Sequence, residues 1–197
     1  MSTVELQPIE YNFHFPWRDL ENDRVKLVLF DNAAGSFLLL AILDKASPGE
    51  PLAGITGFLD ADPANLSVEV GVLVCLLAFQ RRGLTSAAVA LLLQYCLDVP
   101  RNGGLGLRRV TYASHIANAA SVGFARRMGF VFEGVARWEK MLVEGKPGNG
   151  KSVAGREGDP RAGMGGRDTA WFSLCWDDWE GGRREAVCRP EYAMRRS

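Results

Sequence analysis

Residues Val68 to Ala90 read VEVGVLVCLLAFQRRGLTSAAVA. In this stretch an apolar, strand-like run meets the turn QRRGLTS, which opens directly into a helical segment. Gly83 lets the backbone come close to a ligand, Thr85 or Ser86 can cap the helix, and the first N–H groups of a helix have no intrahelical acceptor. The pattern predicts an anion cradle, suited to a pyrophosphate. An ordinary connector between strand and helix is the alternative.

Two arginines stand immediately before that glycine. Arg81 and Arg82 can add charge-assisted contacts, which favour a phosphate over a neutral ligand. Further along, NAASVGFARRMGF predicts a second helix, with Asn118 as its N-cap and Gly129 as its C-cap. A strand-like segment, Arg108 to Ala113, precedes it.

Together these motifs resemble the GNAT superfamily of acyl-CoA-dependent N-acyltransferases, and within it the RimJ/RimL branch. The matching segments are LENDRVKL (20–27), GITGFLD (54–60), VEVGV (68–72), QRRGLTS (80–86), the Asn-x-Ala-Ser…Gly-Phe…Glu-Gly pattern from Asn118 to Gly134, and RDTAWFSLCWDDW (167–179). Each segment is short, but their shared order and spacing make the joint resemblance specific.

The resemblance implies an α/β (α+β) GNAT fold, with a mixed, mostly antiparallel central sheet of about six or seven strands flanked by helices. It also implies acetyl-CoA as cosubstrate and no metal. The residues it places against CoA are Val72, Leu73, Val74, Gln80, Arg81, Arg82, Gly83, Leu84, Thr85, Ser86, Asn118 and Ser121. Arg81 and Thr85 are bulkier than the residues usual at these two positions, which tests the cradle most directly.

The reaction so implied is direct attack of an amine on a thioester, for which a base must take a proton. Glu69 is the first candidate base, acting directly or through a water, and a solvated strand carboxylate is the alternative. Glu139 is a second candidate. His115, whose ordinary pKa of about 6.5 suits base chemistry, is a third, although a histidine at a strand end is more often structural.

The leaving thiolate needs a proton donor. Many GNAT enzymes use a tyrosine four residues before the Gly-Phe pair, but that position here is Ala125. In the RimJ/RimL branch a serine contacts the CoA sulfur, and by position this is Ser121. Asn118 lies one helical turn before Ser121, so both side chains can reach the pantetheine. Cys75 invites a covalent acyl-enzyme, but a buried structural thiol is the simpler interpretation.

The 197 residues, 47% of them apolar, suit one domain that covers the whole chain. Lys+Arg and Asp+Glu both number 23, so we expect neither a nucleic acid nor a membrane partner. Four scattered cysteines with two histidines form no zinc pattern. These features, with an N-terminus unlike a signal peptide, predict a cytoplasmic monomer or homodimer.

The segment 144–166 has eight glycines among 23 residues and predicts a mobile loop, either a lid or a tolerated insertion. For the whole chain we expect an N-acetyltransferase acting on a small-molecule amine or a protein N-terminus. A non-catalytic acyl-CoA-binding module and an O-acyltransferase are the alternatives.

Overall fold

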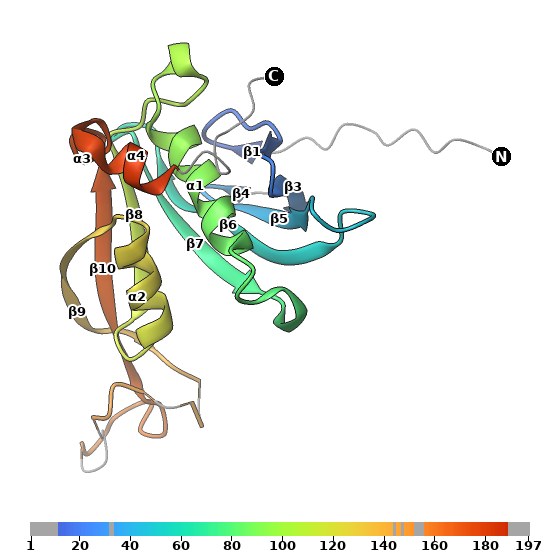
Figure 1. The fold of residues 1–197 in the computed structure, drawn as a ribbon. Helices are drawn as coiled ribbons and strands as arrows, with labels where there is room; N and C mark the ends of the chain where they lie inside the picture. Colours follow the sequence, from blue (N-terminus) through green and yellow to red (C-terminus); the bar gives the residue numbers. More distant parts are fainter. Residues whose placement is uncertain (1–11, 32–33, 144, 147, 152–155, 189–197) are drawn as a thin grey trace.

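One mixed sheet organises the molecule. The structure is a computed structural model that describes residues 12–31, 34–143, 145–146, 148–151 and 156–188. Its main sheet has eight strands in the order β2-β3-β5-β6-β7-β8-β10-β9 (Figure 1). Their bounds are β2 Leu20–Glu21, β3 Val25–Asp31, β5 Leu38–Asp44, β6 Leu52–Asp62, β7 Ser67–Cys75, β8 Arg109–His115, β9 Val131–Met141 and β10 Gly166–Cys175. A small parallel pair, β1 (Asn12–Phe13) with β4 (Ala34–Gly35), lies apart from it.

The GNAT-type α/β architecture is as predicted, but the main sheet has eight strands rather than six or seven. The segment 20–27, expected as one strand, is a tight hairpin between β2 and β3. Its turn forms because the Asn22 Oδ1 atom accepts hydrogen bonds from the N–H groups of Arg24 and Val25, at 2.8 and 2.9 Å. An asparagine side chain that bonds the backbone two or three residues ahead favours a turn over an extended chain.

β7 and β8 are the parallel pair in this sheet, and they are paired only at their beginnings. The register joins Ser67, Val68 and Glu69 of β7 to Arg109, Val110 and Thr111 of β8. Beyond Glu69 the two strands separate, and Figure 1 shows the sheet dividing there into two halves. Their backbone groups on the facing edges then lack the ladder that a continued parallel pair would form.

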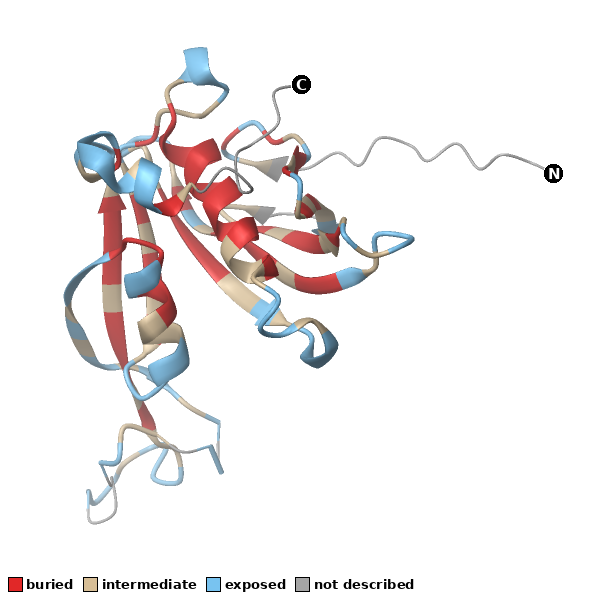
Figure 2. Ribbon diagram, viewed as in Figure 1, coloured by how far each residue is buried: buried red, intermediate tan, exposed pale blue. Residues whose placement is uncertain are grey.

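The long helix α1 (Leu84–Leu97) follows β7 after a short helical turn, η1 (Leu77–Phe79). We predicted one apolar stripe on this helix, but every residue of it except Thr85 and Ser86 is buried (Figure 2). The sheet covers one side, and aromatic residues cover others: the rings of Trp17 and Tyr95 lie 5.6 Å apart. The indole of Trp179 also donates to Asp98, just past the helix end.

The second helix, α2 (Ala119–Arg127), lies against β8 and has an exposed outer face (Figure 2). Asn118 is its N-cap, as predicted. The C-cap is Met128, and Gly129 follows it at φ 84°, a left-handed conformation that glycine adopts readily. The chain ends its described part with short helical segments, α3 (Trp176–Asp178), η3 (Trp179–Arg183) and α4 (Arg184–Val187). A short turn, η2 (Pro100–Asn102), follows α1.

The glycine-rich loop joins β9 to β10, and its base is tied down. Asp168 accepts hydrogen bonds from the Trp138 N–H and from the Asn149 side chain, both at 2.8 Å. Leu142 N–H donates to the Gly165 carbonyl at 2.8 Å. Residues 144, 147 and 152–155 of this loop lie outside the described part.

All four cysteines are free thiols. In the described residues, none of the helices is both long and apolar enough to cross a membrane.

Candidate acyl-transfer site

The site begins at a bulge in β7. Gly71 pairs with Gly57 and Val74 with Ile55, so β7 carries one residue more than β6 between these two pairs. Val72 takes φ 52° within this bulge. Bulges bend a strand and redirect its side chains, which here carries β7 away from β8. An extended amide-bearing ligand can therefore use the backbone groups that β7 presents on its free edge.

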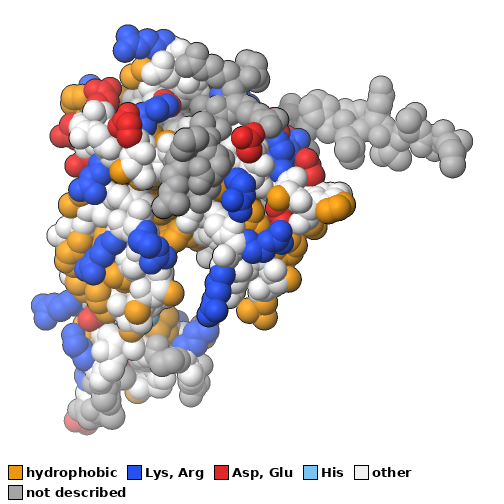
Figure 3. All heavy atoms as spheres, viewed as in Figure 1, with side chains coloured by type: hydrophobic (Ala, Val, Ile, Leu, Met, Phe, Trp, Pro, Cys, Tyr) orange, Lys and Arg blue, Asp and Glu red, His pale blue; other side chains and the backbone are white. Residues whose placement is uncertain are grey.

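A cleft of about 500 Å³ occupies the space between the diverging strands, α1 and α2. Figure 3 shows a hollow between the two halves of the molecule, with basic side chains on its margin. The predicted CoA contacts that line the cleft are Leu73, Arg81, Gly83, Leu84, Thr85, Ser86, Asn118 and Ser121. Among the predicted contacts, Val72, Val74, Gln80 and Arg82 are not among the lining residues. The Gln80 side chain instead donates to the Cys75 carbonyl at 3.4 Å.

The start of α1 forms one end of this cleft. Gly83 is the N-cap residue, at φ 79°, and no side chain caps the helix. The Gly83 carbonyl accepts the Ala87 N–H at 3.0 Å, so the N–H groups of Leu84, Thr85 and Ser86 have no acceptor within the helix. Our prediction that Thr85 or Ser86 caps the helix is wrong, because both lie inside the first turn. The open N–H groups and the helix dipole suit an anion.

The two arginines before α1 point to different partners. Arg81 lines the cleft, whereas the Arg82 guanidinium lies 2.9 Å from the buried Asp44 carboxylate. Burial alone would raise the pKa of Asp44, but hydrogen bonds from Ser47 and the Ala46 N–H, together with the Arg82 charge, hold it below its usual range. Arg82 therefore joins α1 to the β5 end of the sheet, and the predicted phosphate contact of its side chain is not formed. Arg127 of α2 lines the cleft in its place.

Hydroxyl groups line the wall formed by α2 and β8. The Asn118 Oδ1 atom accepts the Ser121 N–H at 3.1 Å, which confirms the capping role. The Ser121 hydroxyl lies 2.7 Å from the Tyr112 hydroxyl, and both residues line the cleft. Burial raises the pKa of Tyr112, the Ser121 hydrogen bond opposes that effect, and the nearby Glu69 charge adds to it. Ala125 is buried behind this wall.

Tyr112 was missed by sequence reasoning, as were Phe79, Phe124 and Arg127. The available signal was the alternation of β8: Val110, Tyr112 and Ser114 are the buried positions of RVTYASH. That pattern places the three side chains on one face but does not reveal that α2 brings Ser121 to the second of them.

Glu69 lies where β7 and β8 make their last pair. Its carboxylate is only 8% exposed, and Val68 and Val70 on either side of it belong to the core under α1. Strand alternation therefore places Glu69 on the opposite face of the sheet from α1. A side chain on Gly71 would lie within 3.4 Å of its carboxylate oxygen, so the glycine keeps that space open. Burial, and secondly the Asp60 charge, raise the pKa of Glu69 to about 7.

The two reserve bases have other partners. Glu139 of β9 accepts a hydrogen bond from the Thr169 hydroxyl, and its charge also raises the pKa of Glu69. His115 ends β8, where its Nδ1 accepts the Ala117 N–H at 3.0 Å. Neither side chain is among the residues that line the cleft.

Cys75 does line the cleft, and its Sγ lies 3.7 Å from the Leu76 carbonyl. Glu133 of the Glu-Gly motif has a structural role, because Arg109 binds its two oxygens at 2.6 Å each and Ser173 donates to it at 2.7 Å. Three neighbouring strands are joined in this way.

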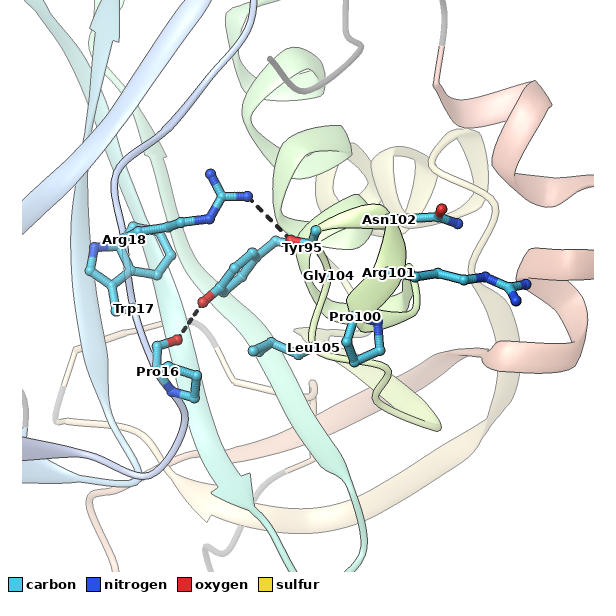
Figure 4. A pocket seen from close by; sticks show the side chains of 10 residues that line it. Pro16, Trp17, Arg18, Tyr95, Pro100, Arg101, Asn102, Gly104 and Leu105 are labelled. Atoms are coloured by element: carbon cyan, nitrogen blue, oxygen red, sulfur yellow. Dashed lines mark hydrogen bonds between the residues drawn. The ribbon is translucent and has the colours of Figure 1, made fainter. Parts of the chain in front are cut away.

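A second cavity of about 500 Å³ lies at the other end of α1 (Figure 4). Arg18 donates to the Gly103 carbonyl at 3.2 Å along its edge, and the Tyr95 hydroxyl donates to the Pro16 carbonyl. Its lining residues include no carboxylate, histidine or cysteine, so it offers no base or nucleophile for acyl transfer.

Comparison with known proteins identifies the family. Residues 8–131 match the family model described as Acetyltransferase (GNAT) domain. A GCN5-related N-acetyltransferase from Brucella melitensis is 30% identical with a TM-score of 0.59, over 76% of this chain and 55% of that one. A protein from Chromobacterium violaceum assigned to the GNAT family is 26% identical with a TM-score of 0.54, over 74% and 62%. This chain therefore spans less than two thirds of either relative.

A variant of spermidine N-acetyltransferase SpeG from Vibrio cholerae shares the fold at 14% identity and a TM-score of 0.53, over 73% of this chain and 67% of that one. A search of curated protein sequences finds no match. The family match covers more than half of the chain, and the cleft has the anion-binding helix start that acyl-CoA chemistry needs. The chain belongs to the GNAT family of acetyltransferases and is an acyltransferase.

Proposed function

We propose that the chain transfers an acetyl group from acetyl-CoA to an amine by direct attack, with Glu69 as the general base. One observation carries the proposal: a single cleft joins the uncapped start of α1 to the Tyr112–Ser121 hydroxyl pair, beside the free edge of β7. Glu69 stands at the point where the two strands begin to separate. The motif pattern from Asn118 to Gly134 supports the RimJ/RimL branch.

Each part of CoA has matching groups along this cleft. The N–H groups of Leu84, Thr85 and Ser86, with Arg81 and Arg127, suit the pyrophosphate. The free edge of β7 suits the amides of the pantetheine, and the Ser121 hydroxyl suits the sulfur. Arg81 and Thr85 leave the first-turn N–H groups unblocked, which supports the cradle despite their bulk.

The chemistry requires a neutral amine. The nitrogen attacks the thioester carbon, the C–N bond forms, the C–S bond breaks, and Glu69 takes the proton that the nitrogen loses. With a pKa of about 7, Glu69 accepts a proton from an α-ammonium, ordinarily about 7.8, at a cost of about 1 kcal/mol. For a lysine-like ammonium at about 10.4 the same transfer costs about 5 kcal/mol. The base is matched to an α-amine or a similarly weak amine.

The face that carries Glu69 also suits an acceptor with an apolar body. Leu59 pairs with Glu69 on this face, and Val28 and Phe30 of β3 alternate with core positions, Phe30 being 52% exposed. We therefore propose the α-amine of a peptide, a protein N-terminus or an amino-acid-like metabolite as the acceptor class. An acyl-CoA-binding module without turnover is the competing function.

The first experiment records thermal unfolding with acetyl-CoA, CoA and ATP. Ligand at 100 times its dissociation constant adds about 2.7 kcal/mol, which for a chain of this length raises Tm by about 5–10 °C. We expect a shift with both CoA species and none with ATP, and then acetylation of peptides with free N-termini but not of their N-blocked forms. A shift without turnover on any amine would support the binding module instead.

Replacing Glu69 by Gln tests the base. We expect kcat/KM to fall about 100-fold or more, and the rise of kcat/KM with pH near 7 to disappear. Because the folded-state pKa is raised, the wild type loses stability as pH rises from about 4.5 through 7, by up to about 3 kcal/mol. Glu69→Gln should therefore be more stable than the wild type at pH 8, and the difference should vanish near pH 4.

Asp60→Asn is the matched control for this test. It removes a like charge, so it should lower the pKa of Glu69 and move the pH limb downward while activity is kept. Full activity in Glu69→Gln would remove Glu69 from the mechanism.

A further inference from the structure

We propose that Tyr112, acting through Ser121, supplies the proton that the leaving CoA thiolate takes up. The inference rests on the proposed function and assigns the donor that is missing at Ala125. The geometry is a pair of hydroxyls 2.7 Å apart, one on β8 and one on α2, both lining the same cleft.

The phenol is held in place from several sides. The Tyr112 ring centroid lies 6.2 Å from that of Phe124 and 5.5 Å from that of Phe130. Asn118 fixes the first turn of α2, because it accepts the Ser121 N–H at 3.1 Å. The two oxygens are therefore positioned by independent elements, a strand and a capped helix.

Acidity explains why a serine alone is not sufficient. An aliphatic hydroxyl is about as weak an acid as water, about 15.7, whereas a thiol is about 8.5, so a net transfer from serine is unfavourable by about 10⁷. A phenol at about 10 reduces that factor to about 30. Burial raises the pKa of Tyr112 further, which keeps the phenol protonated and able to donate at neutral pH.

The proton balance is simple. As the C–S bond breaks, its electron pair passes to sulfur, and the Ser121 O–H proton moves to that sulfur. The Tyr112 O–H proton moves to the Ser121 oxygen in the same step, so no alkoxide remains on the serine. The tyrosinate regains a proton from solvent, and the products are the acetylated amine and CoA with a free thiol.

No other described tyrosine can take this role. Tyr95, the other tyrosine in the described ranges, lines the second cavity and donates its hydroxyl to the Pro16 carbonyl. Tyr95→Phe thus provides a matched control that removes one buried phenol oxygen far from the chemistry.

The test compares Tyr112→Phe with Tyr95→Phe and the wild type. Phenylalanine preserves the ring packing at position 112, so we expect kcat to fall about 100-fold while KM for acetyl-CoA changes less than about twofold. Substitution by a fluorinated tyrosine, a more acidic phenol, should restore turnover and move the alkaline limb of kcat to lower pH. Unchanged kcat in Tyr112→Phe, or a loss that fluorotyrosine leaves without a pH shift, would overturn the proposal.

A binding measurement separates this inference from the proposed function. At about pH 9 we expect the wild type to prefer CoA over desulfo-CoA, because the hydroxyl pair stabilises the thiolate, and Tyr112→Phe to lose about tenfold of that preference. An equal preference in both proteins overturns the role of Tyr112 even if no amine acceptor is found. A wild type that prefers CoA but acetylates no amine overturns the proposed transfer and leaves the sulfur contact supported.

Discussion

The two helices that border the cleft begin in opposite ways. α1 starts at Gly83 with no side-chain cap, and the N–H groups of Leu84, Thr85 and Ser86 face the cleft unsatisfied by the helix. α2 starts at Asn118, whose side chain accepts the Ser121 N–H. An uncapped start forgoes about 1 kcal/mol of helix stability. The comparison indicates that α1 keeps its donors for a ligand, whereas α2 uses its cap to fix a reactive side chain.

Burial explains how α1 tolerates an open end. All its residues beyond the first turn are buried between the sheet and the aromatic side chains of Trp17 and Trp179, so packing rather than capping determines its stability. α2 is short and exposed on one side, with Phe124 and Ala125 as its buried residues. A short helix with little burial depends more on its cap.

The largest effect should come from placing a carboxylate at the open start. In Thr85→Asp the new charge favours the helix dipole, so we expect stability to rise by about 0.5 kcal/mol. The same charge repels the pyrophosphate by about 3 kcal/mol at about 6 Å and an effective dielectric of about 20, which weakens acetyl-CoA binding about 100-fold. Calorimetric titration measures the binding and thermal unfolding measures the stability.

Ala119→Asp is the matched control, because it places the same charge in the first turn of α2 at an exposed position outside the cleft lining. It should add similar stability and leave acetyl-CoA binding nearly unchanged. Equal loss of binding in both variants would show that net charge, not the α1 start, governs the affinity.

The next largest effect separates two neighbouring arginines. Arg82→Ala leaves the fully buried Asp44 carboxylate without its cation, so we expect the free energy of unfolding to fall by about 2 kcal/mol, or about 4–8 °C in Tm. Arg81→Ala should change Tm little but weaken acetyl-CoA binding about fivefold to tenfold, more strongly at low salt. The reverse outcome, with Arg82→Ala losing affinity and Arg81→Ala losing stability, would contradict the assignment.

Sequence reasoning predicted those parts that depend on neighbouring residues. The strands around Val25, Leu38 and Val68, the helix after Gly83 and the Asn118 cap follow from local alternation, turn residues and capping preferences. The hairpin at Asn22 was missed because a side-chain hydrogen bond, rather than the apolar pattern, ends β2.

The parts that failed depend on residues far apart in the chain. Arg82 lies 38 positions from Asp44, and Tyr112 meets Ser121 only because α2 folds back on β8. Neither partner can be identified from spacing alone. The roles of the predicted site residues in binding and catalysis stay predictions, which the variants above test.

The smallest effect concerns the capped start of α2. In Asn118→Ala the Ser121 N–H loses its acceptor, and we expect the free energy of unfolding to fall by about 1 kcal/mol, or about 2–4 °C in Tm. Asn118→Asp keeps an acceptor oxygen and should restore that stability. Because the cap also fixes Ser121 beside Tyr112, Asn118→Ala should lower kcat a few-fold, and Asn118→Asp should recover stability but give less turnover than the wild type, since its charge disfavours a nearby thiolate. Full recovery of both in Asn118→Asp would show that Asn118 acts only as a cap.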